Sequence, residues 1–541
     1  MSPSSPCRTR HSALLRCYTA TRRTHAPPLQ RSMESSSAII AADAPPPPRP
    51  EQQPPRPHVV LVASPGAGHL NPMAELARRL VAHHSLAVTL VTIPDPSAGP
   101  KPNDSHSAAA TLSSTATGFT TIVLPSVPLD DLPADAPIGT VLFELIARSI
   151  PHLRDVVAAA SPPLAALVPD LFTAATLPLA AELAVPGYLF IPASLTALHV
   201  MRALVELHDD ASLGEHRDLP DPLLFPCGAA LRHEDVPVGM EDSKAPVYAQ
   251  IVEEGRRYRL AAGLLVNTFY EMEPAAVEEF KFAAERGTFP PVYPVGPFVR
   301  SSSEEDAASR CVTEWLDRQP NGSVVYVSFG SAGSLSVEQT AELAAGLEES
   351  GHRFLWVVRM PSLDGQNHSD MGKRGDLSRG EEDDPLAWLP EGFLDRTSGR
   401  GLAVRSWAPQ VAVLSHPATG AFVSHCGWNS TLESVSYGVP MVAWPLYAEQ
   451  RMNAVFLSES VGVALRPCAR VSDGVIGREE VAAAVRELME GEKGRAVRRR
   501  TGELRQAADM AWAPEGSSRR AMEEVAERWR AAALGREEVR Q

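Results

Sequence analysis

The sequence has little of several things that mark common classes of protein. It contains six cysteines in 541 residues, and no two of them form a C-x-x-C pair, which argues against a disulfide-stapled scaffold and favours a reducing compartment. No apolar run approaches the roughly 18 residues that a membrane-spanning helix needs. The formal net charge is −15, which argues against a surface that neutralises nucleic-acid phosphates. We therefore expect a cytoplasmic protein with no membrane span and no nucleic-acid partner.

Motifs for a dinucleotide or a metal are also missing. No G-x-G-x-x-G follows the first apolar run, so an NAD(P)-dependent oxidoreductase is disfavoured, although it remains an alternative for a two-domain α/β chain. The acidic run 381–384 lies in a polar insertion with no strand end to fix its geometry. The spacing of His416, His425 and Cys426 fits no familiar zinc pattern. We predict no metal site.

The first 57 residues differ in composition from the rest. Residues 1–33 hold six arginines and no acidic residue, a composition that matches an organellar transit peptide. However, Met33 opens a plausible chain of its own, and we favour the interpretation that residues 1–32 do not belong to the working protein. An organellar location is the alternative. Residues 45–57 are rich in proline and should be extended and unpacked.

From His58 onward, short apolar runs alternate with helix-length amphipathic segments. This pattern is typical of parallel strands covered by helices on both faces. Asn71 and Pro72 should begin the first helix, which runs to Leu80. We expect a mobile surface loop between Pro361 and Asp384. The expected strands are 58–64, 86–93, 119–125, 165–170, 187–193 and 263–269 in a first sheet, and 323–330, 353–359, 401–407, 420–425 and 440–445 in a second.

The predicted fold is α/β, with two Rossmann-like, doubly wound parallel-sheet domains facing across a cleft. Ligands of such sheets bind at the carboxyl ends of the strands, so the active site is expected in the cleft. The expected divisions are a disordered leader, 1–57; a first, acceptor-binding domain, 58–299; a linker, 300–310; a second, donor-binding domain, 311–515; and a C-terminal helix and tail, 516–541.

Two residues at strand ends of the first domain are candidates for catalysis. His69 lies in the glycine-rich turn PGAGH after the first strand, where capping or packing is the common role of such a residue. Asp170 ends the strand AALVPD and should lie at the same sheet edge. An aspartate there can orient a histidine base and stabilise its imidazolium. Asp170 could equally be the N-cap of the helix that follows.

The most informative segment is 407–450. His425 ends a strand, and the sequence CGWNS then opens a helix whose N-terminal amides suit a pyrophosphate. Glu433 lies one turn further and can accept hydrogen bonds from ribose hydroxyls. Trp407 offers a flat face for a base. Glu449 and Gln450 suit the hydroxyls of a sugar.

This segment resembles, without a gap, the signature box of the plant secondary-product glycosyltransferases within the UDP-glycosyltransferase superfamily, which has the GT-B fold. The resemblance extends from His58 to near Trp529. It implies catalysis by His69 with Asp170, although a second acid that relatives often carry in DLFGTDA is absent here. The phrases HCGWNSTLESV, WPLYAEQ and LLVNTF are most similar to the branch that glucosylates small phenolics such as hydroquinone and monolignols. The donor-binding residues that the resemblance implies are Ser64, Ser331, Trp407, Gln410, His425, Trp428, Asn429, Ser430, Glu433, Glu449 and Gln450.

The resemblance implies an inverting, metal-independent transfer of glucose from UDP-glucose, a co-substrate, to a hydroxyl of a small lipophilic acceptor. Gln450, at the end of the box, is the residue that the family associates with glucose. No cofactor is expected, and the chain should act as a monomer. The alternative of another class is a non-catalytic protein that binds a UDP-sugar or a phenolic ligand. Transfer to nitrogen or sulfur, rather than oxygen, also stays open.

Overall fold

The computed structural model describes residues 56–94, 118–133, 136–160, 164–210, 216–300, 307–363, 368–369, 384–470, 472 and 474–540. All but two residues of the predicted leader 1–57 lie outside this range. So do most of the predicted linker 300–310 and most of the predicted loop 361–384, including Glu381, Glu382 and Asp383. The last four residues of the predicted linker belong to a helix.

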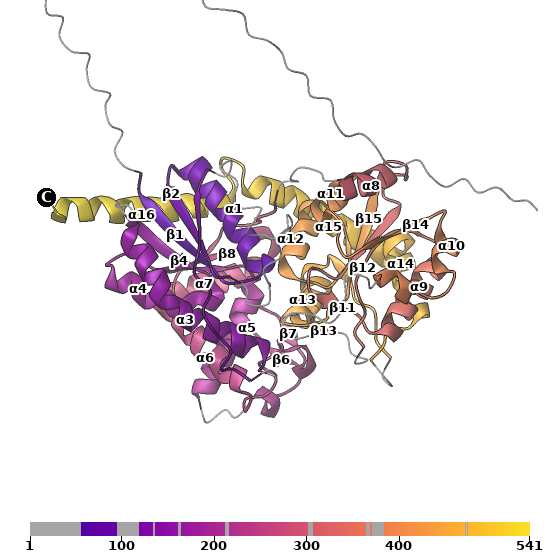
Figure 1. Cartoon of the computed structure of the whole chain (residues 1–541), viewed down its shortest axis with the longest axis horizontal. Helices are drawn as coiled ribbons and strands as arrows, with labels where there is room; N and C mark the ends of the chain where they lie inside the picture. The colour runs from indigo at the N-terminus through magenta and orange to yellow at the C-terminus, as the bar shows by residue number, and fades with distance from the viewer. Residues whose placement is uncertain are drawn as a thin grey trace, which may run out of the picture. The chain divides into compact units, whose positions relative to one another are not determined.

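The first half of the chain builds a parallel sheet in the order β3-β2-β1-β4, which two single bridges between β4 and β5 extend into β5-β8-β9. Figure 1 labels β1, β2, β4 and β8 of this sheet. The order runs outward from β1 in both directions, as in a doubly wound fold. The strands are β1 His58–Ala63, β2 Ala87–Thr92, β3 Thr120–Val123, β4 Leu164–Pro169, β5 Tyr188–Ile191, β8 Gly263–Val266 and β9 Val292–Pro294.

Helices cover this sheet on both faces. Val59 and Leu61 of β1 belong to one buried cluster, whereas Val60 and Val62 belong to another, which explains the uninterrupted apolar run of the strand. The helices are α1 Ala67–His84, α3 Ile138–Ala159, α4 Leu177–Glu182, α5 Leu195–Asp209, α6 Pro246–Arg257 and α7 Pro274–Glu285. The short helical turns are η2 Leu171–Thr176, η3 His216–Asp218, η4 His233–Asp235, η5 Tyr258–Leu260 and η6 Tyr270–Met272. A small hairpin pairs β6 Leu223–Leu224 with β7 Ala230–Leu231.

The prediction for the first helix was wrong at its start. α1 begins at Ala67, so Pro72 lies inside the helix and not in its first turn. Proline has no N–H, and the carbonyl of Gly68, four residues earlier, therefore receives no hydrogen bond from within the helix. The Nδ2 of Asn429, from the second half of the chain, donates to this carbonyl over 2.8 Å. A partner distant in sequence thus makes the early start of the helix tolerable.

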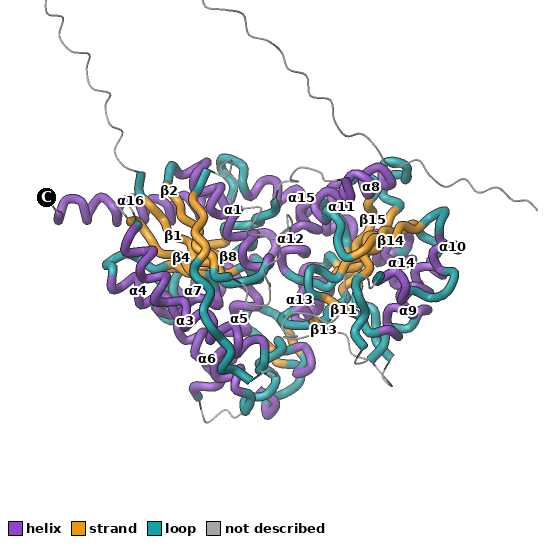
Figure 2. The backbone as a smooth tube through the Cα atoms, viewed as in Figure 1, coloured by secondary structure: helices purple, strands orange, loops and turns teal. Residues whose placement is uncertain are grey.

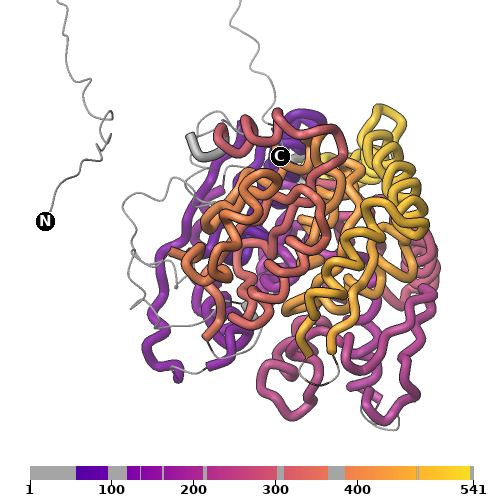
Figure 3. The backbone as a smooth tube through the Cα atoms, turned by 90° about the vertical axis from the view of Figure 1, so that its right-hand side faces the viewer, coloured from indigo at the N-terminus to yellow at the C-terminus, as the bar shows by residue number. Residues whose placement is uncertain are grey.

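The second half builds a six-stranded parallel sheet in the order β14-β12-β10-β15-β16-β17. Figure 2 shows the two groups of strands, each among helices, and Figure 3 shows helices of the second half on the side facing the viewer. The strands are β10 Val324–Ser328, β12 Arg353–Val358, β14 Gly401–Arg405, β15 Thr419–Ser424, β16 Met441–Ala443 and β17 Ala464–Leu465. The other elements are α8 Ala307–Leu316, α9 Val337–Ser350, η7 Pro385–Trp388, α10 Phe393–Thr397, α11 Gln410–Ser415, α12 Trp428–Ser436, α13 Gln450–Val455, η8 Phe456–Val461, α14 Arg478–Glu490 and α15 Glu492–Ala511.

Each expected strand occurs at its expected place in one of these sheets. Within the expected loop 361–384, the described residues include a short strand, β13 His368–Ser369, which pairs with β11 Gly333–Ser334. Among the described residues, none of the helices combines the length and the apolar character that crossing a bilayer requires.

The last helix, α16 Ser517–Arg540, returns to the first sheet. Met522, Val525 and Trp529 are buried in the same cluster as β1 residues. The Trp529 ring meets that of Tyr188 edge-on, with centroids 5.3 Å apart. The end of the chain therefore completes the core of its first half (Figure 1).

Candidate active site

The side chains of His69 and Asp170 meet at the carboxyl edge of the first sheet. His69 lies in the first turn of α1, directly after β1, and Asp170 directly follows β4, the neighbour of β1. The His69 Nδ1 lies 3.1 Å from the Asp170 Oδ2. Asp170 is fully buried, whereas the imidazole of His69 is partly exposed. One edge of the imidazole is thus fixed, and Nε2 is the nitrogen that remains for a ligand.

Asp170 also caps η2, so the two arrangements considered for it, a helix cap and a partner of His69, occur together. Its Oδ1 accepts from the backbone amides of Phe172 and Thr173, at 3.1 and 3.2 Å, and from the Thr173 hydroxyl. Its Oδ2 accepts from the Ser64 amide at 2.9 Å and the Ser64 hydroxyl at 2.6 Å. Ser64 is buried, and its hydroxyl faces Asp170. Six donors therefore converge on one carboxylate and fix its orientation.

These bonds decide the charge of the pair. Burial alone would raise the pKa of Asp170, but the hydrogen bond and charge of His69 and the bonds from Ser64 outweigh it, so this pKa lies below its ordinary value. Asp170 is ionised at neutral pH. The ring of Phe172 covers the imidazole, with centroids 5.0 Å apart, and Phe143 meets Phe172 edge-on at 5.9 Å. Phe172 was not among the predicted site residues, since core packing is the commoner role of an apolar side chain.

The start of α12 presents a second arrangement of donors. His425 is buried between two glycines: a Cβ on Gly330 or Gly427 would lie 2.6 or 2.5 Å from its Nε2. Burial lowers the pKa of His425 to about 4, so the imidazole is neutral. Its Nδ1 has no hydrogen-bond partner among the described residues. Ser331, which follows Gly330, is exposed.

A hydrogen-bonded group on α11 and α12 joins three of the predicted donor-binding residues. The Nε2 of Gln410 donates to the Ser430 Oγ at 2.8 Å and to the Glu433 Oε2 at 2.7 Å. Burial raises the pKa of Glu433 to about 7, although Gln410 and the charge of Arg300 oppose this. Arg300 was not predicted; it comes near Glu433 only through the fold, and no local motif marks it.

The two tryptophans of the box differ in their surroundings. Trp407 is 52% exposed and presents its ring at the end of β14. Trp428 is buried, and its Nε1 donates to the carbonyl of Asn267, in the first half, at 2.7 Å. With the bond from Asn429 to Gly68, this places the first turn of α12 directly against the first half of the chain.

Glu449 and Gln450 lie after β16. Burial raises the pKa of Glu449, and the charge of His69 opposes the shift, so these two groups from different halves are electrostatic neighbours. The Gln450 Oε1 accepts from the amides of Leu446 and Tyr447, at 2.9 and 3.0 Å. Its amide nitrogen is therefore the end that can donate to a ligand.

Strained backbone marks three strand ends of the second sheet. Ser406, Cys426 and Ala448 have φ values of 58°, 64° and 53°, in the left-handed region that costs a non-glycine residue about 1–2 kcal/mol. Each comes shortly before residues of the predicted donor set. Such strain persists where the surrounding structure fixes it, and it clusters at ligand sites.

Three of the residues considered for a metal have other surroundings. His416 Nε2 lies 3.2 Å from an oxygen of Asp317, Cys426 is buried with its pKa raised to about 12, and Asp384 pairs with Arg405. Among the residues that the structure describes, no three His, Cys, Asp or Glu side chains form a group that would hold a metal ion.

Two parallel sheets of Rossmann strand order, with a histidine–aspartate pair at the edge of one and a donor-lined helix start at the edge of the other, define the class of GT-B glycosyltransferases. Comparison with known proteins identifies the family within this class. A family model described as "UDP-glucoronosyl and UDP-glucosyl transferase" matches residues 299–499. A hydroquinone glucosyltransferase of Rauvolfia serpentina is 44% identical over 475 residues, which cover 87% of this chain and 98% of the relative.

Solved structures agree. The structure of Phytolacca americana UGT2 with UDP-2-fluoro-glucose and pterostilbene matches at 40% identity and a TM-score of 0.77, covering 87% of this chain and 99% of the other. A Polygonum tinctorium UDP-glucosyltransferase capable of glucosylating indoxyl, in complex with 3,4-dichloroaniline, matches at 42% identity and a TM-score of 0.77, covering 88% and 99%. The chain belongs to the UDP-glycosyltransferase family, and the oxidoreductase alternative is thereby excluded.

Proposed function

We propose that this chain transfers glucose from UDP-glucose to a hydroxyl group of a small phenolic acceptor, with inversion at the anomeric carbon. The observation that carries the proposal is the pair of His69 and Asp170, 3.1 Å apart and beside Glu449 of the donor set. The activities named for the similar proteins, on hydroquinone and on indoxyl, support the acceptor class.

The base is His69. Because its Nδ1–H donates to the ionised Asp170, the imidazole is held in the tautomer whose Nε2 is unprotonated. Nε2 takes the proton of the acceptor hydroxyl, the acceptor oxygen forms a bond to the anomeric carbon, and the bond from that carbon to the UDP oxygen breaks, with its electron pair leaving on UDP. Asp170 then stabilises the imidazolium.

UDP binds across the carboxyl edge of the second sheet. Trp407 stacks on the base, Gln410 contacts the uridine, and Glu433 accepts from the ribose hydroxyls. The amides at the start of α12, with His425, Asn429 and Ser430, bind the diphosphate, and Ser331 lies near it. These donors offset the charge of the departing UDP, so we propose that transfer needs no divalent metal.

The sugar and the acceptor meet between the halves. Glu449 and the amide nitrogen of Gln450 bind sugar hydroxyls, while the buried Trp428 shapes the wall behind them. Phe172, which packs on the imidazole of His69, and Phe143, which packs on Phe172, provide apolar surface next to the base, and such a surface suits an aromatic acceptor. Ser64 orients Asp170, since both its amide and its hydroxyl donate to that carboxylate, and contact of Ser64 with the donor stays a prediction.

The test is release of UDP by the purified protein with UDP-glucose and a panel of simple phenols, with and without EDTA. We expect turnover of at least one phenol, resistance to EDTA, and loss of nearly all activity in His69→Ala. His352→Ala is the control, because His352 pairs with Glu490 far from the site. If the wild type binds UDP-glucose but turns over no acceptor, the hypothesis of a non-catalytic binding protein is favoured.

A further inference from the structure

The turn that carries Glu449 and Gln450 is held by a segment from the first half of the chain. We define residues 446–450 as the sugar turn and residues 233–241 as the latch segment. We propose that the latch segment positions the sugar turn, so that affinity for the sugar part of the donor depends on residues of the acceptor-binding half. This inference rests on the proposed function.

The sugar turn is strained and needs outside support. Ala448, next to Glu449, has a φ of 53°, which a non-glycine residue keeps only where other contacts fix it. Inside the turn, Gln450 supplies two such contacts through Leu446 and Tyr447. From outside, the amide of Val238 donates to the carbonyl of Ala448 over 3.1 Å. The latch segment therefore bonds directly to the strained residue.

Ion pairs fix the same segment on either side of this bond. The Arg451 Nη1 donates to the carbonyl of Glu234 and to the Glu241 Oε1, both at 3.2 Å. The Arg466 Nη2 lies 2.7 Å from an oxygen of Asp235, which is buried. Arg451 directly follows Gln450, so its guanidinium links the end of the sugar turn to the latch segment.

Apolar packing joins α13 to the latch segment as well. Met452 and Val455 of α13 are buried in one cluster with Val236 and Met240 of the latch segment. Buried Asn453, on the same short helix, donates to the Cys426 carbonyl at 2.9 Å and to the Glu449 Oε1 at 3.4 Å. The contacts thus run from the latch segment through α13 to the carboxylate of Glu449.

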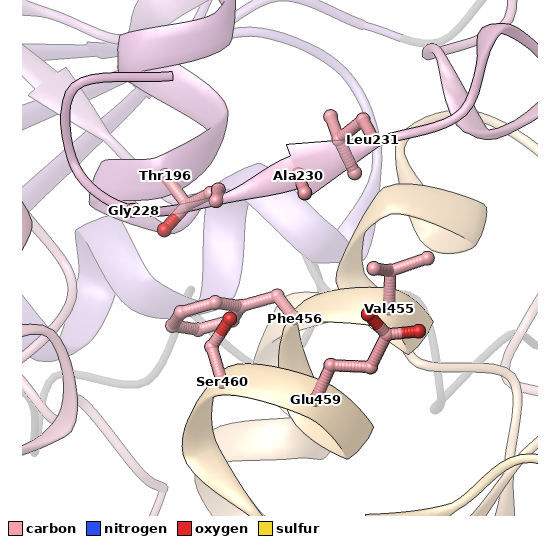
Figure 4. A pocket seen from close by; sticks show the side chains of 9 residues that line it. Thr196, Gly228, Ala230, Leu231, Val455, Phe456, Glu459 and Ser460 are labelled. Atoms are coloured by element: carbon pink, nitrogen blue, oxygen red, sulfur yellow. The ribbon is translucent and has the colours of Figure 1, made fainter. Parts of the chain in front are cut away.

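Two pockets lie beside the latch segment. Figure 4 shows a pocket between β7, with Ala230 and Leu231, and the helices that carry Val455 and Glu459. Its volume is about 170 Å³. A larger cavity of about 1180 Å³ adjoins it. Glu234 and Asp235 of the latch segment are among the residues that line this larger cavity.

The nucleotide part of the site is held differently. Gln410, Ser430 and Glu433 bond to one another within the second half. Loosening the latch segment should therefore weaken binding of UDP-glucose and leave binding of UDP unchanged, a difference that general loss of stability does not produce.

The experiment compares Val238→Pro, which deletes the amide donor, with Val238→Ala, which keeps it; calorimetry measures binding of UDP and of UDP-glucose. We expect the affinity for UDP-glucose to fall about fivefold in the proline variant, which is the change in affinity that the loss of one hydrogen bond produces. The affinity of this variant for UDP should not change. The alanine variant should bind both ligands as the wild type does. Equal weakening of both ligands, or no difference between the two variants, would overturn the proposal. A wild type that does not bind UDP-glucose would instead overturn the proposed function.

Should the proline variant fail to fold, Glu241→Gln gives the same comparison. Its control is Glu348→Gln, which breaks the pair with Arg396 inside the second half. We expect about a twofold loss of UDP-glucose affinity, typical of a partly exposed ion pair, in Glu241→Gln alone. If the two variants bind UDP-glucose equally well, the latch segment does not position the sugar turn.

Discussion

Replacing Asp170 by asparagine probes the whole arrangement around the base. The carboxylate accepts from six donors, three on each oxygen, whereas asparagine offers one oxygen and an NH2 group. With the NH2 toward η2, the amides of Phe172 and Thr173 both lose their acceptor, at about 1–3 kcal/mol each. With the NH2 toward His69, one buried amide, that of Ser64, loses its acceptor.

The second orientation therefore costs less, and it reverses the imidazole. The Nδ1 of His69 becomes an acceptor of the asparagine N–H, so the proton moves to Nε2 and the base is blocked. We expect kcat to fall about 10⁴-fold, the size of the tautomer effect in a Ser-His-Asp triad, with KM for UDP-glucose little changed. Stopped assays of glucoside formation measure both. A folded Asp170→Asn variant that keeps kcat within tenfold of the wild type would refute this role of Asp170.

Three further predictions concern the donor and the core. Because burial raises the pKa of Glu433 to about 7, the ionised fraction of its carboxyl falls from about nine-tenths at pH 8 to about one-tenth at pH 6. KM for UDP-glucose should therefore rise as the pH falls over this range. Glu433→Gln should remove this pH dependence of KM. Trp407→Ala should weaken binding of UDP by about 1–3 kcal/mol, the contribution of stacking on the base. It should not lower the melting temperature, since the ring is half exposed. Calorimetry measures the affinity and thermal melts the stability, and an unchanged UDP affinity would contradict the stacking role. Trp529→Ala should lower the free energy of unfolding by about 3–5 kcal/mol, because it empties a fully buried site; denaturant titration measures it, and a loss below 1 kcal/mol would show that α16 is not part of the core.

Much of the architecture was predictable because it follows from local pattern. Strands buried on both faces leave continuous apolar runs, such as that of β1, and the runs occurred where the sheets have their strands. The meeting of His69 and Asp170 at one edge followed from the rule that parallel strands end together. Their hydrogen bond, and the fact that Asp170 both caps η2 and contacts His69, could not be predicted, since a helix cap and an acid that orients a histidine look alike in sequence.

Other features could not be predicted because they depend on contacts between distant segments. The start of α1 was placed too late, since the bond that satisfies Gly68 comes from Asn429. The left-handed residues before the donor groups are Ser, Cys and Ala, which give no signal of positive φ. Arg300 and the latch segment bear no motif, and their relation to Glu433 and to Ala448 arises only when the halves pack.

The bond between Asn429 and the carbonyl of Gly68 ties one half of the chain to the start of a helix in the other half. Because Pro72 has no N–H, the Gly68 carbonyl lacks the partner that the helix would otherwise supply, and it can accept from a donor outside α1. The amide of Asn429 takes this place at 2.8 Å. A proline inside a helix, which costs stability in an isolated element, thus provides an acceptor at which the two halves meet.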